Sequence, residues 1–369
     1  MIIYVALGIA LIIPAGFLAV VRMFDLFGTG KFLVNLVTIA AGVVAYSFAA
    51  KINPALIDAG WVTRNQVIRI TAPILEEFLK ALILIYLVQR ADFNYVVDGA
   101  IYGFGAGIGF AMIENIEYVT GNPELALTIA VARVLSTNLV HATASGIIGT
   151  ALAYRRGDVT WRGWLFAALG YIFSIGFHMG FNTMVSRGTF LIFAIAFGFI
   201  GVGLILYVIR QGLNIQKGWV GEKLGDQDRV TKGEVQIVQN IENIKKQILE
   251  PVRKQFGADK VPVVEKIIYN QAEMGVKRKL LESTPSESKR REIEAIIQKL
   301  GKEMVSLQKE AGFYCMMFVR RVYLGQNTKV FDSLTTRIAE SGTGQKGGGL
   351  FDRASERMKQ PPSQKEDKS

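Results

Sequence analysis

The chain has 369 residues, half of them hydrophobic, a formal net charge of +11 and one cysteine, Cys315. A single cysteine excludes an intrachain disulfide, and a mean hydropathy of +0.30 argues against a wholly soluble protein. Residues 1–210 hold only 13 of the 42 Lys and Arg residues and 10 of the 31 Asp and Glu residues. We therefore expect a membrane-embedded domain at 1–210 and a water-soluble region after it.

Seven apolar segments are long enough to cross a bilayer, for which about 20 residues are needed. The predicted fold is therefore all-α, a polytopic membrane helix bundle of about seven spans with a C-terminal soluble helical domain. The first segment has no basic residue before its apolar core and no evident cleavage site, so we expect an uncleaved anchor. The segments are 2–21, 32–50, 67–89, 95–117, 125–153, 164–185 and 189–209.

The loop charges predict the orientation of these spans. With the N-terminus outside, the inside loops hold six basic residues and the outside loops three. The basic C-terminal region also falls inside, as the positive-inside rule prefers. We therefore expect a multi-pass plasma-membrane protein with its N-terminus outside and its C-terminus in the cytoplasm.

The third segment carries two adjacent carboxylates, Glu76 and Glu77, followed by Lys80. Spacings of three and four residues place Lys80 on one helical face with either glutamate. Lys80 can therefore neutralise one carboxylate while the other stays available to activate water. A structural ion pair at a helix crossing would explain Glu77 and Lys80, but not the second carboxylate.

The fourth segment is rich in glycine and ends with Glu114 and Asn115. Its glycines at 99, 103 and 107, and at 105 and 109, have the four-residue spacing that lets helix backbones approach closely. We interpret them as packing residues that give Glu114 and Asn115 a rigid support. A carboxylate this close to a helix end could also simply reach water.

Both histidines lie in apolar segments: His141 in the fifth and His178, four residues before Asn182, in the sixth. Singly, each could be a structural polar residue between helices. Ionisable groups in hydrocarbon are costly and are kept there mainly for function. Helix depth places the polar groups of four segments in the outer half of the bilayer, so we expect one shared site. A set rich in His and Glu is typical of a buried zinc-type site, which favours an intramembrane hydrolase.

Four motifs, in order and each within a membrane span, resemble the PrsW family of intramembrane proteases. They are EEFLK at 76–80, FAMIEN at 110–115, His141 and HMGFN at 178–182. The family belongs to the wider superfamily of CAAX prenyl endopeptidases and bacteriocin-immunity (Abi) membrane proteins. The resemblance covers roughly residues 65–185.

The resemblance implies a metal-dependent or glutamate-dependent peptidase that cleaves membrane-tethered proteins, anti-sigma factors among the substrates of some members. In CAAX-type relatives the first glutamate of the pair activates water, which here is Glu76. Which of the two glutamates is the base stays open, as does a metal-free mechanism. The implied site residues are Glu76, Glu77 and Asn182 in catalysis, Lys80 and Asn115 in support, and Glu114, His141 and His178 as ligands of an ion, expected to be zinc.

The part of the chain after residue 210 lies outside this resemblance. Helical spacing predicts helices over 234–257, 262–282 and 286–324, so we expect a cytoplasmic helical domain at 211–340 that binds a protein partner or regulates the protease. A disordered tail is expected at 341–369. The positive charge of this region suits anionic lipid better than nucleic acid, and no nucleic-acid partner is expected.

Two other functions compete with the peptidase hypothesis. Buried Glu, Lys, Arg and His also build proton relays, so a proton-coupled membrane transporter stays open. Against it, no inverted repeat is apparent within 1–210, and the polar groups cluster toward one side. The third possibility is a non-catalytic membrane scaffold that binds a partner through its helical C-terminal region.

Overall fold

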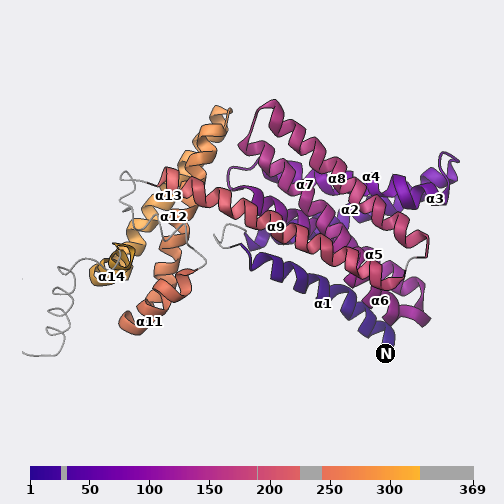
Figure 1. Cartoon of the computed structure of the whole chain (residues 1–369), viewed down its shortest axis with the longest axis horizontal. Helices are drawn as coiled ribbons and strands as arrows, with labels where there is room; N and C mark the ends of the chain where they lie inside the picture. The colour runs from indigo at the N-terminus through magenta and orange to yellow at the C-terminus, as the bar shows by residue number, and fades with distance from the viewer. Residues whose placement is uncertain (26–30, 189, 225–242, 325–369) are drawn as a thin grey trace, which may run out of the picture.

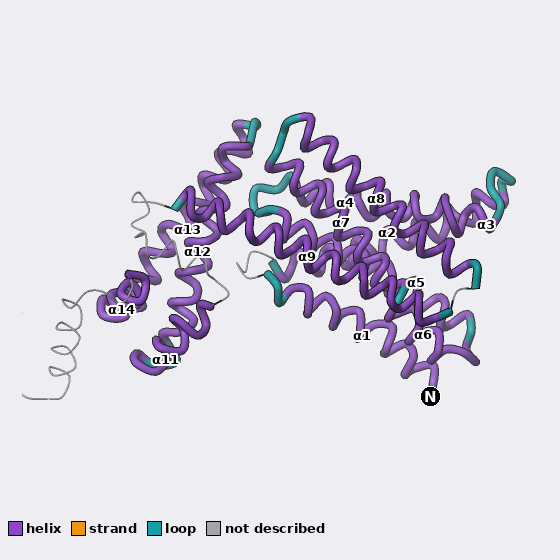
Figure 2. Tube along the Cα trace, viewed as in Figure 1, coloured by secondary structure: helices purple, strands orange, loops and turns teal. Residues whose placement is uncertain are grey.

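The computed structural model describes residues 1–25, 31–188, 190–224 and 243–324 (Figure 1). Within these ranges every regular element is a helix, and there is no strand (Figure 2). The predicted all-α fold, a membrane helix bundle with a helical C-terminal part, is therefore confirmed. The predicted tail at 341–369 and the beginning of the first predicted cytoplasmic helix, 234–242, lie outside the described residues.

Six helical runs of the described chain are long and apolar enough to cross a membrane. The expected span at 67–89 is not among them, because it is divided between shorter elements. The last expected span continues beyond residue 210 without a break. The six runs are α1 (Ile2–Arg22), α2 (Phe32–Asp58), α5 (Val96–Gly121), the run Pro123–Gly157, α8 (Trp161–Ser186) and α9 (Leu191–Lys223).

Pro73 explains why the 67–89 segment is divided. A short α3 (Arg64–Gln66) leads into the π-helix η1 (Val67–Thr71), and α4 (Ala72–Val88) follows with 17 residues. Proline has no N–H to donate to the carbonyl four residues earlier. The Ala72 N–H instead bonds to the Val67 carbonyl, which is the wider spacing of a π-turn.

The expected span at 125–153 is interrupted at Ser136. After the short turn η2 (Pro123–Leu125), α6 (Ala126–Leu135) ends at this residue and α7 (Thr137–Gly157) begins beyond it. The Ser136 hydroxyl donates to a carbonyl of the preceding turn, at 2.6 Å. Small polar side chains compete in this way with the backbone hydrogen bonds of a helix. The interruption separates α6, which contacts α5, from α7.

Helix α5 is the buried centre of the bundle, and its glycines set how closely its neighbours approach. A Cβ atom added to Gly103 would lie 2.2 Å from the Ser145 carbonyl oxygen of α7, and one on Gly107 would lie 2.3 Å from that of His141. On the opposite side, a Cβ on Gly109 would lie 2.0 Å from the Ile39 carbonyl oxygen of α2. The repeated glycines thus bring α7, with His141, directly against α5.

Replacing Gly103 with alanine is expected to lower the stability of the bundle. The added methyl would overlap backbone, which cannot rotate away as a side chain can, and overpacking of this kind costs about 1–3 kcal/mol. The measurement is thermal unfolding of the purified protein in detergent. Gly180→Ala in α8 is the control, because no atom lies within 4 Å of its added Cβ. Equal melting temperatures for the two variants would contradict the close α5–α7 contact.

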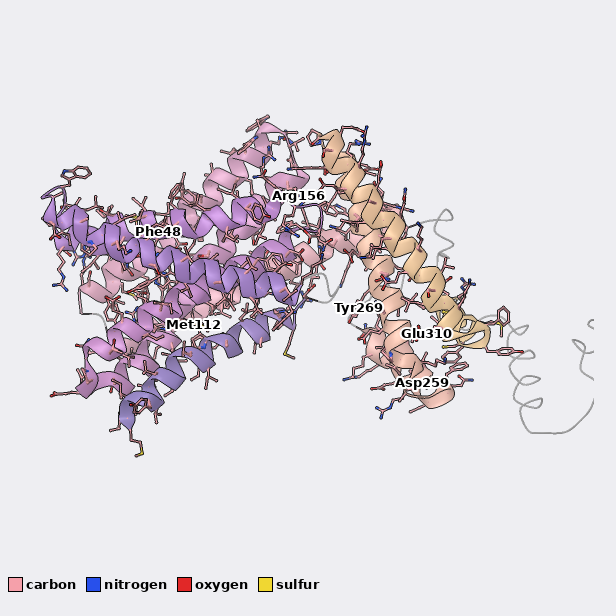
Figure 3. All side chains as sticks on the ribbon, turned by 180° about the vertical axis from the view of Figure 1, so that it is seen from behind. Phe48, Met112, Arg156, Asp259, Tyr269 and Glu310 are labelled. Carbon is pink, nitrogen blue, oxygen red and sulfur yellow. The ribbon has the colours of Figure 1, made fainter. Side chains whose placement is uncertain are left out.

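The C-terminal helices pack against one end of the bundle (Figure 3). A continuous hydrophobic cluster extends from α5 through α9 into α12. Lys277 of α12 is fully buried and donates to the carbonyls of Ala91 and Phe93, at 2.6 and 3.2 Å. Burial lowers the pKa of this ammonium group. The helices are η5 (Lys245–Leu249), α11 (Glu250–Phe256), α12 (Lys260–Ser283), α13 (Glu287–Ala311) and α14 (Phe313–Leu324).

Candidate active site

Four helices bring the predicted carboxylates and histidines into one cluster. Helix α4 supplies the glutamate pair and Lys80, α5 supplies Glu114, α7 supplies His141 and α8 supplies His178. The cluster lies beside α6 and η1, because Arg133 of α6 pairs with Glu114 and Asn182 of α8 contacts Ile68 of η1. Figure 1 shows α3 and α6 at the end of the bundle that is distant from the C-terminal helices. The cluster thus combines residues that are about 100 positions apart in the sequence, such as Glu77 and His178.

Glu77 is fully buried, and both of its carboxylate oxygens are hydrogen-bonded. Its Oε1 accepts from Lys80 Nζ at 2.6 Å and lies 2.9 Å from His178 Nδ1. Its Oε2 accepts from the Ser145 hydroxyl at 3.1 Å. A carboxylate held by three partners has a fixed orientation and little freedom to accept another proton donor. Glu77 is therefore suited to orienting the cluster.

Glu76, its neighbour in the sequence, has fewer polar contacts than Glu77. Its side chain is 11% exposed, and its Oε2 lies 3.9 Å from His178 Nε2, too far for a direct hydrogen bond. Within the described residues the Glu76 carboxylate makes no hydrogen bond. One water molecule off the line between these two atoms could bond to both. Of the two adjacent glutamates, Glu76 is thus the one with free acceptor capacity.

Both ring nitrogens of His141 have partners. Lys80 Nζ lies 3.1 Å from Nδ1, and an ammonium group can only donate, so Nδ1 accepts. Nε2 lies 2.9 Å from Glu114 Oε2 and therefore carries the donated proton. The ring also meets that of His178, with centroids 4.5 Å apart. His141 thus connects Lys80, Glu114 and His178.

A second ion pair flanks the cluster through Arg133, for which no role was predicted. Arg133 of α6 lies 2.9 Å from Glu114 Oε2, and its Nε donates to the Asn115 Oδ1 at 2.9 Å. Its guanidinium carbon lies 3.8 Å from the ring centroid of Tyr118. The sequence feature that could have identified Arg133 is a positive charge within an apolar segment. The orientation of Arg133 toward α5 depends on the helix break at Ser136, which was not predicted.

Ser145 also belongs to the cluster, although no role was predicted for it. It lies one turn after His141 on α7, so the four-residue spacing was the available signal. Its hydroxyl is fully buried against Glu77. A serine on a glycine-rich helix face looks like a packing residue until its partner on α4 is known.

Asn182 contacts the π-helix that precedes the glutamate pair. Its Nδ2 donates to the Ile68 carbonyl at 2.9 Å. The residue five positions after Ile68 is Pro73, which has no N–H, so this carbonyl lacks its π-helical donor. Arg69 Nε also donates to the Ser186 hydroxyl at 2.7 Å. Together these contacts hold the end of α8 against the turn that positions Glu76.

The donor set of the cluster fits a metal ion. One ligand atom from each of Glu76, His141 and His178 lies within 4.8 Å of the others. Two imidazoles with one carboxylate is a known catalytic zinc set. A carboxylate on the far nitrogen of a ligating histidine, as Glu77 has on His178, is a common supporting contact. Glu114, the predicted ligand, lies beside His141 but is already paired with Arg133.

Charge pairing singles out Glu76 among the three carboxylates. Glu77 is paired with Lys80, and Glu114 with Arg133. Glu76 has no lysine or arginine partner of this kind, and its one ion-pair contact within the described residues is His178 Nε2, at 3.9 Å. Buried charges in proteins are normally paired or bound to a metal, so Glu76 is the group that still requires a cation or a proton.

Two comparisons with known proteins found a match to this chain. The family model described as PrsW family intramembrane metalloprotease matches residues 27–214, which contain the whole cluster. The chain is also similar to Protease PrsW of Geobacillus kaustophilus (strain HTA426), at 36% identity over 81 residues. That alignment covers 22% of this chain and 35% of the relative, so the chain spans about a third of the curated relative's length. No solved structure matches the chain.

Proposed function

Because this chain belongs to the PrsW family of intramembrane metalloproteases, we propose that it hydrolyses peptide bonds of membrane-tethered proteins at the Glu76–His178 centre. The observation that carries the proposal is the unequal binding of the glutamate pair. Glu77 is held by three partners, whereas Glu76 has no hydrogen bond within the described residues. A scaffold protein has no need for an unpaired buried carboxylate beside two histidines.

In this proposal Glu76 is the general base. It takes a proton from a water molecule that is also bound to His178 Nε2, and the water oxygen forms the new bond to the peptide carbonyl carbon. When the carbon–nitrogen bond breaks, Glu76 returns the proton to the leaving amine. The group thus ends the cycle in its starting state, and one water is consumed for each bond that is cleaved.

Glu77 orients His178 for this step. Because its carboxylate accepts from Nδ1–H, the other ring nitrogen keeps a free lone pair that faces Glu76. Lys80 neutralises Glu77, which reduces the repulsion between the two adjacent carboxylates. Asn182 is proposed to stabilise the oxyanion or to orient the turn before Glu76, and its contact with Ile68 supports the second role.

A bound zinc ion would be held by His141 and His178, with Glu114 as the third protein ligand. The ion would supply Lewis acidity and a lower pKa for the attacking water. Ligation by His141 would replace one of its present contacts, because Lys80 and Glu114 occupy its two nitrogens. The proximity of Glu76 to both histidines is required of a base in such a site, and it also allows Glu76 to be a ligand.

Zinc content of purified variants is expected to separate these roles. His178→Ala should lose most of the zinc that the wild-type protein retains, because it removes a ligand. Glu76→Gln should keep its zinc, because a base is not needed for binding. The measurement is elemental analysis after purification in detergent. Loss of zinc from Glu76→Gln equal to that from His178→Ala would instead make Glu76 the third ligand and would refute its assignment as base.

The proposed activity is tested on membranes, since the substrate is unknown. Membranes containing overproduced wild-type protein or His178→Ala are incubated, and new peptide termini in single-span proteins are mapped by mass spectrometry. We expect new termini in or beside the spans of such proteins with the wild-type protein alone. Identical termini in both samples, or none in either, would refute the peptidase proposal.

A further inference from the structure

A cavity of about 520 Å³ lies where the C-terminal helices meet the membrane bundle, at the end distant from the glutamate pair. Its walls come from the ends of α4 and α7, the loop after α7, the start of α8, and the turn between α12 and α13. The cavity therefore exists only because the C-terminal part is docked. Its size is that of a small-molecule site. The lining residues are Ile85, Val88, Gln89, Leu152, Arg155, Arg156, Val159, Trp164, Ser283, Thr284, Pro285 and Lys289.

The charged residues that line this cavity are all basic. Arg155, Arg156 and Lys289 line it, and no Asp or Glu is among the lining residues. Arg156 is already used in the fold, because its guanidinium donates to the carbonyls of Val88 and Arg90, at 2.8 and 2.6 Å. Figure 3 shows Arg156 at the junction between the two parts of the molecule. Arg155 and Lys289 are left to bind an anion.

Arg155 is held in place, but one of its hydrogen-bond donors has no acceptor. Its guanidinium carbon lies 4.1 Å from the ring centroid of Trp164, a cation–π contact that fixes its direction. Its Nε is buried and has no hydrogen-bond partner among the described residues. Lys289 likewise forms no ion pair within the described part of the chain. A buried donor without an acceptor costs free energy, which an anion in the cavity would recover.

The apolar part of the cavity is continuous with the surface that faces lipid. Ile85, Val159 and Trp164 line the cavity and are 42%, 41% and 58% exposed. Trp161, one turn before Trp164, is 69% exposed. Tryptophans next to basic residues at the end of spanning helices are typical of the membrane–water interface. A ligand with an anionic head and apolar chains would satisfy both parts of the cavity.

We propose that this cavity binds the headgroup of an anionic phospholipid, with its phosphate at Arg155 and Lys289 and its acyl chains along Ile85 and Trp164. A zwitterionic lipid would bring its own cation beside the arginines and is disfavoured. The apolar wall distinguishes a lipid from a soluble phosphate compound, which would leave that wall uncovered. The lipid would then join the C-terminal helices to the membrane domain. This inference does not depend on the proposed peptidase activity.

The test is native mass spectrometry of the purified full-length protein with added phosphatidylglycerol or phosphatidylcholine. We expect preferential retention of phosphatidylglycerol, and an affinity about 30-fold lower in Arg155→Gln/Lys289→Gln, since each basic residue at a membrane surface contributes about a fivefold change. Arg162→Gln is the matched control, because Arg162 lies at the same end of α8 but does not line the cavity. Its phosphatidylglycerol affinity should stay within twofold of the wild-type value.

Two further measurements test whether the lipid occupies the cavity itself. Val159→Trp keeps every charge and narrows the cavity, so it should weaken phosphatidylglycerol binding even where the double variant folds poorly. Inorganic phosphate at millimolar concentration should not displace the lipid. Equal losses in Arg162→Gln and the double variant, unchanged binding in Val159→Trp, or displacement by inorganic phosphate would each overturn the assignment. The last result would make the ligand a soluble phosphate compound.

Discussion

Replacing Glu76 with glutamine is expected to abolish peptide hydrolysis while the protein stays folded. The substitution keeps the size of the side chain but removes the group that accepts the proton from water, and general-base catalysis contributes about 10²–10⁴-fold in rate. Because the Glu76 carboxylate makes no hydrogen bond within the described residues, little structural stabilisation is lost with it. The measurement is the rate of cleavage of a membrane-tethered substrate identified by terminus mapping, beside thermal unfolding of the same sample.

Two comparison variants make this prediction specific. Glu124→Gln removes an exposed carboxylate near the same end of the bundle and should leave the rate unchanged. Glu77→Gln should also lose activity, but with a lower melting temperature, since it disturbs Lys80, Ser145 and His178 together. Full activity in Glu76→Gln with loss of activity in Glu77→Gln at an unchanged melting temperature would exchange the roles of the two glutamates.

Replacing Lys80 with methionine is expected to produce the largest loss of stability of any single change at the site. Lys80 and Glu77 are both completely buried, with their charged atoms 2.6 Å apart. Removing one partner of a buried ion pair leaves an uncompensated charge and costs about 3–5 kcal/mol. The measurement is denaturant unfolding in detergent, compared with Lys51→Met, which removes an exposed lysine of α2.

The double variant Glu77→Gln/Lys80→Met separates charge from packing. With both charges gone, much of the stability lost in Lys80→Met should return, because a neutral amide replaces the buried carboxylate and no unpaired charge remains. Catalytic activity should not return, since His178 has lost its orienting carboxylate. If Lys80→Met and the double variant are equally unstable, the loss of stability comes from the packing of the Lys80 side chain. The ion pair would then not be what stabilises the site.

The spans and the polar residues of the site could be read from the sequence for a simple physical reason. Hydrocarbon requires long apolar helices, and a charged residue within one is conspicuous because it is costly. Glu76, Glu77, Lys80, His141 and His178 stand out on that ground alone. The four-residue glycine spacing of α5 likewise indicates close helix packing before any coordinates are known.

Local backbone detail was harder to predict from the sequence. The break at Ser136 and the π-turn before Pro73 both depend on where a carbonyl finds its donor, and that donor is partly supplied by other helices. Arg133 therefore points at Glu114 from a separate helix, where one continuous span was expected. The role of Asn182 changes for the same reason, because its partner is a carbonyl that the π-turn leaves without a donor.

The sequence by itself determined that this is an all-α membrane protein with a costly set of buried carboxylates and histidines, because hydropathy and charge are properties of single residues and their spacing. Only the tertiary structure distinguished the two adjacent glutamates, since their difference lies in partners from other helices: Lys80, Ser145 and His178 hold Glu77, and none of them hydrogen-bonds Glu76. The cavity at Arg155 and Lys289 likewise needs the docking of α12 and α13 on the bundle. Pairing between distant segments is a property of the folded chain, and it decides which of the two described carboxylates is left without a hydrogen-bond partner.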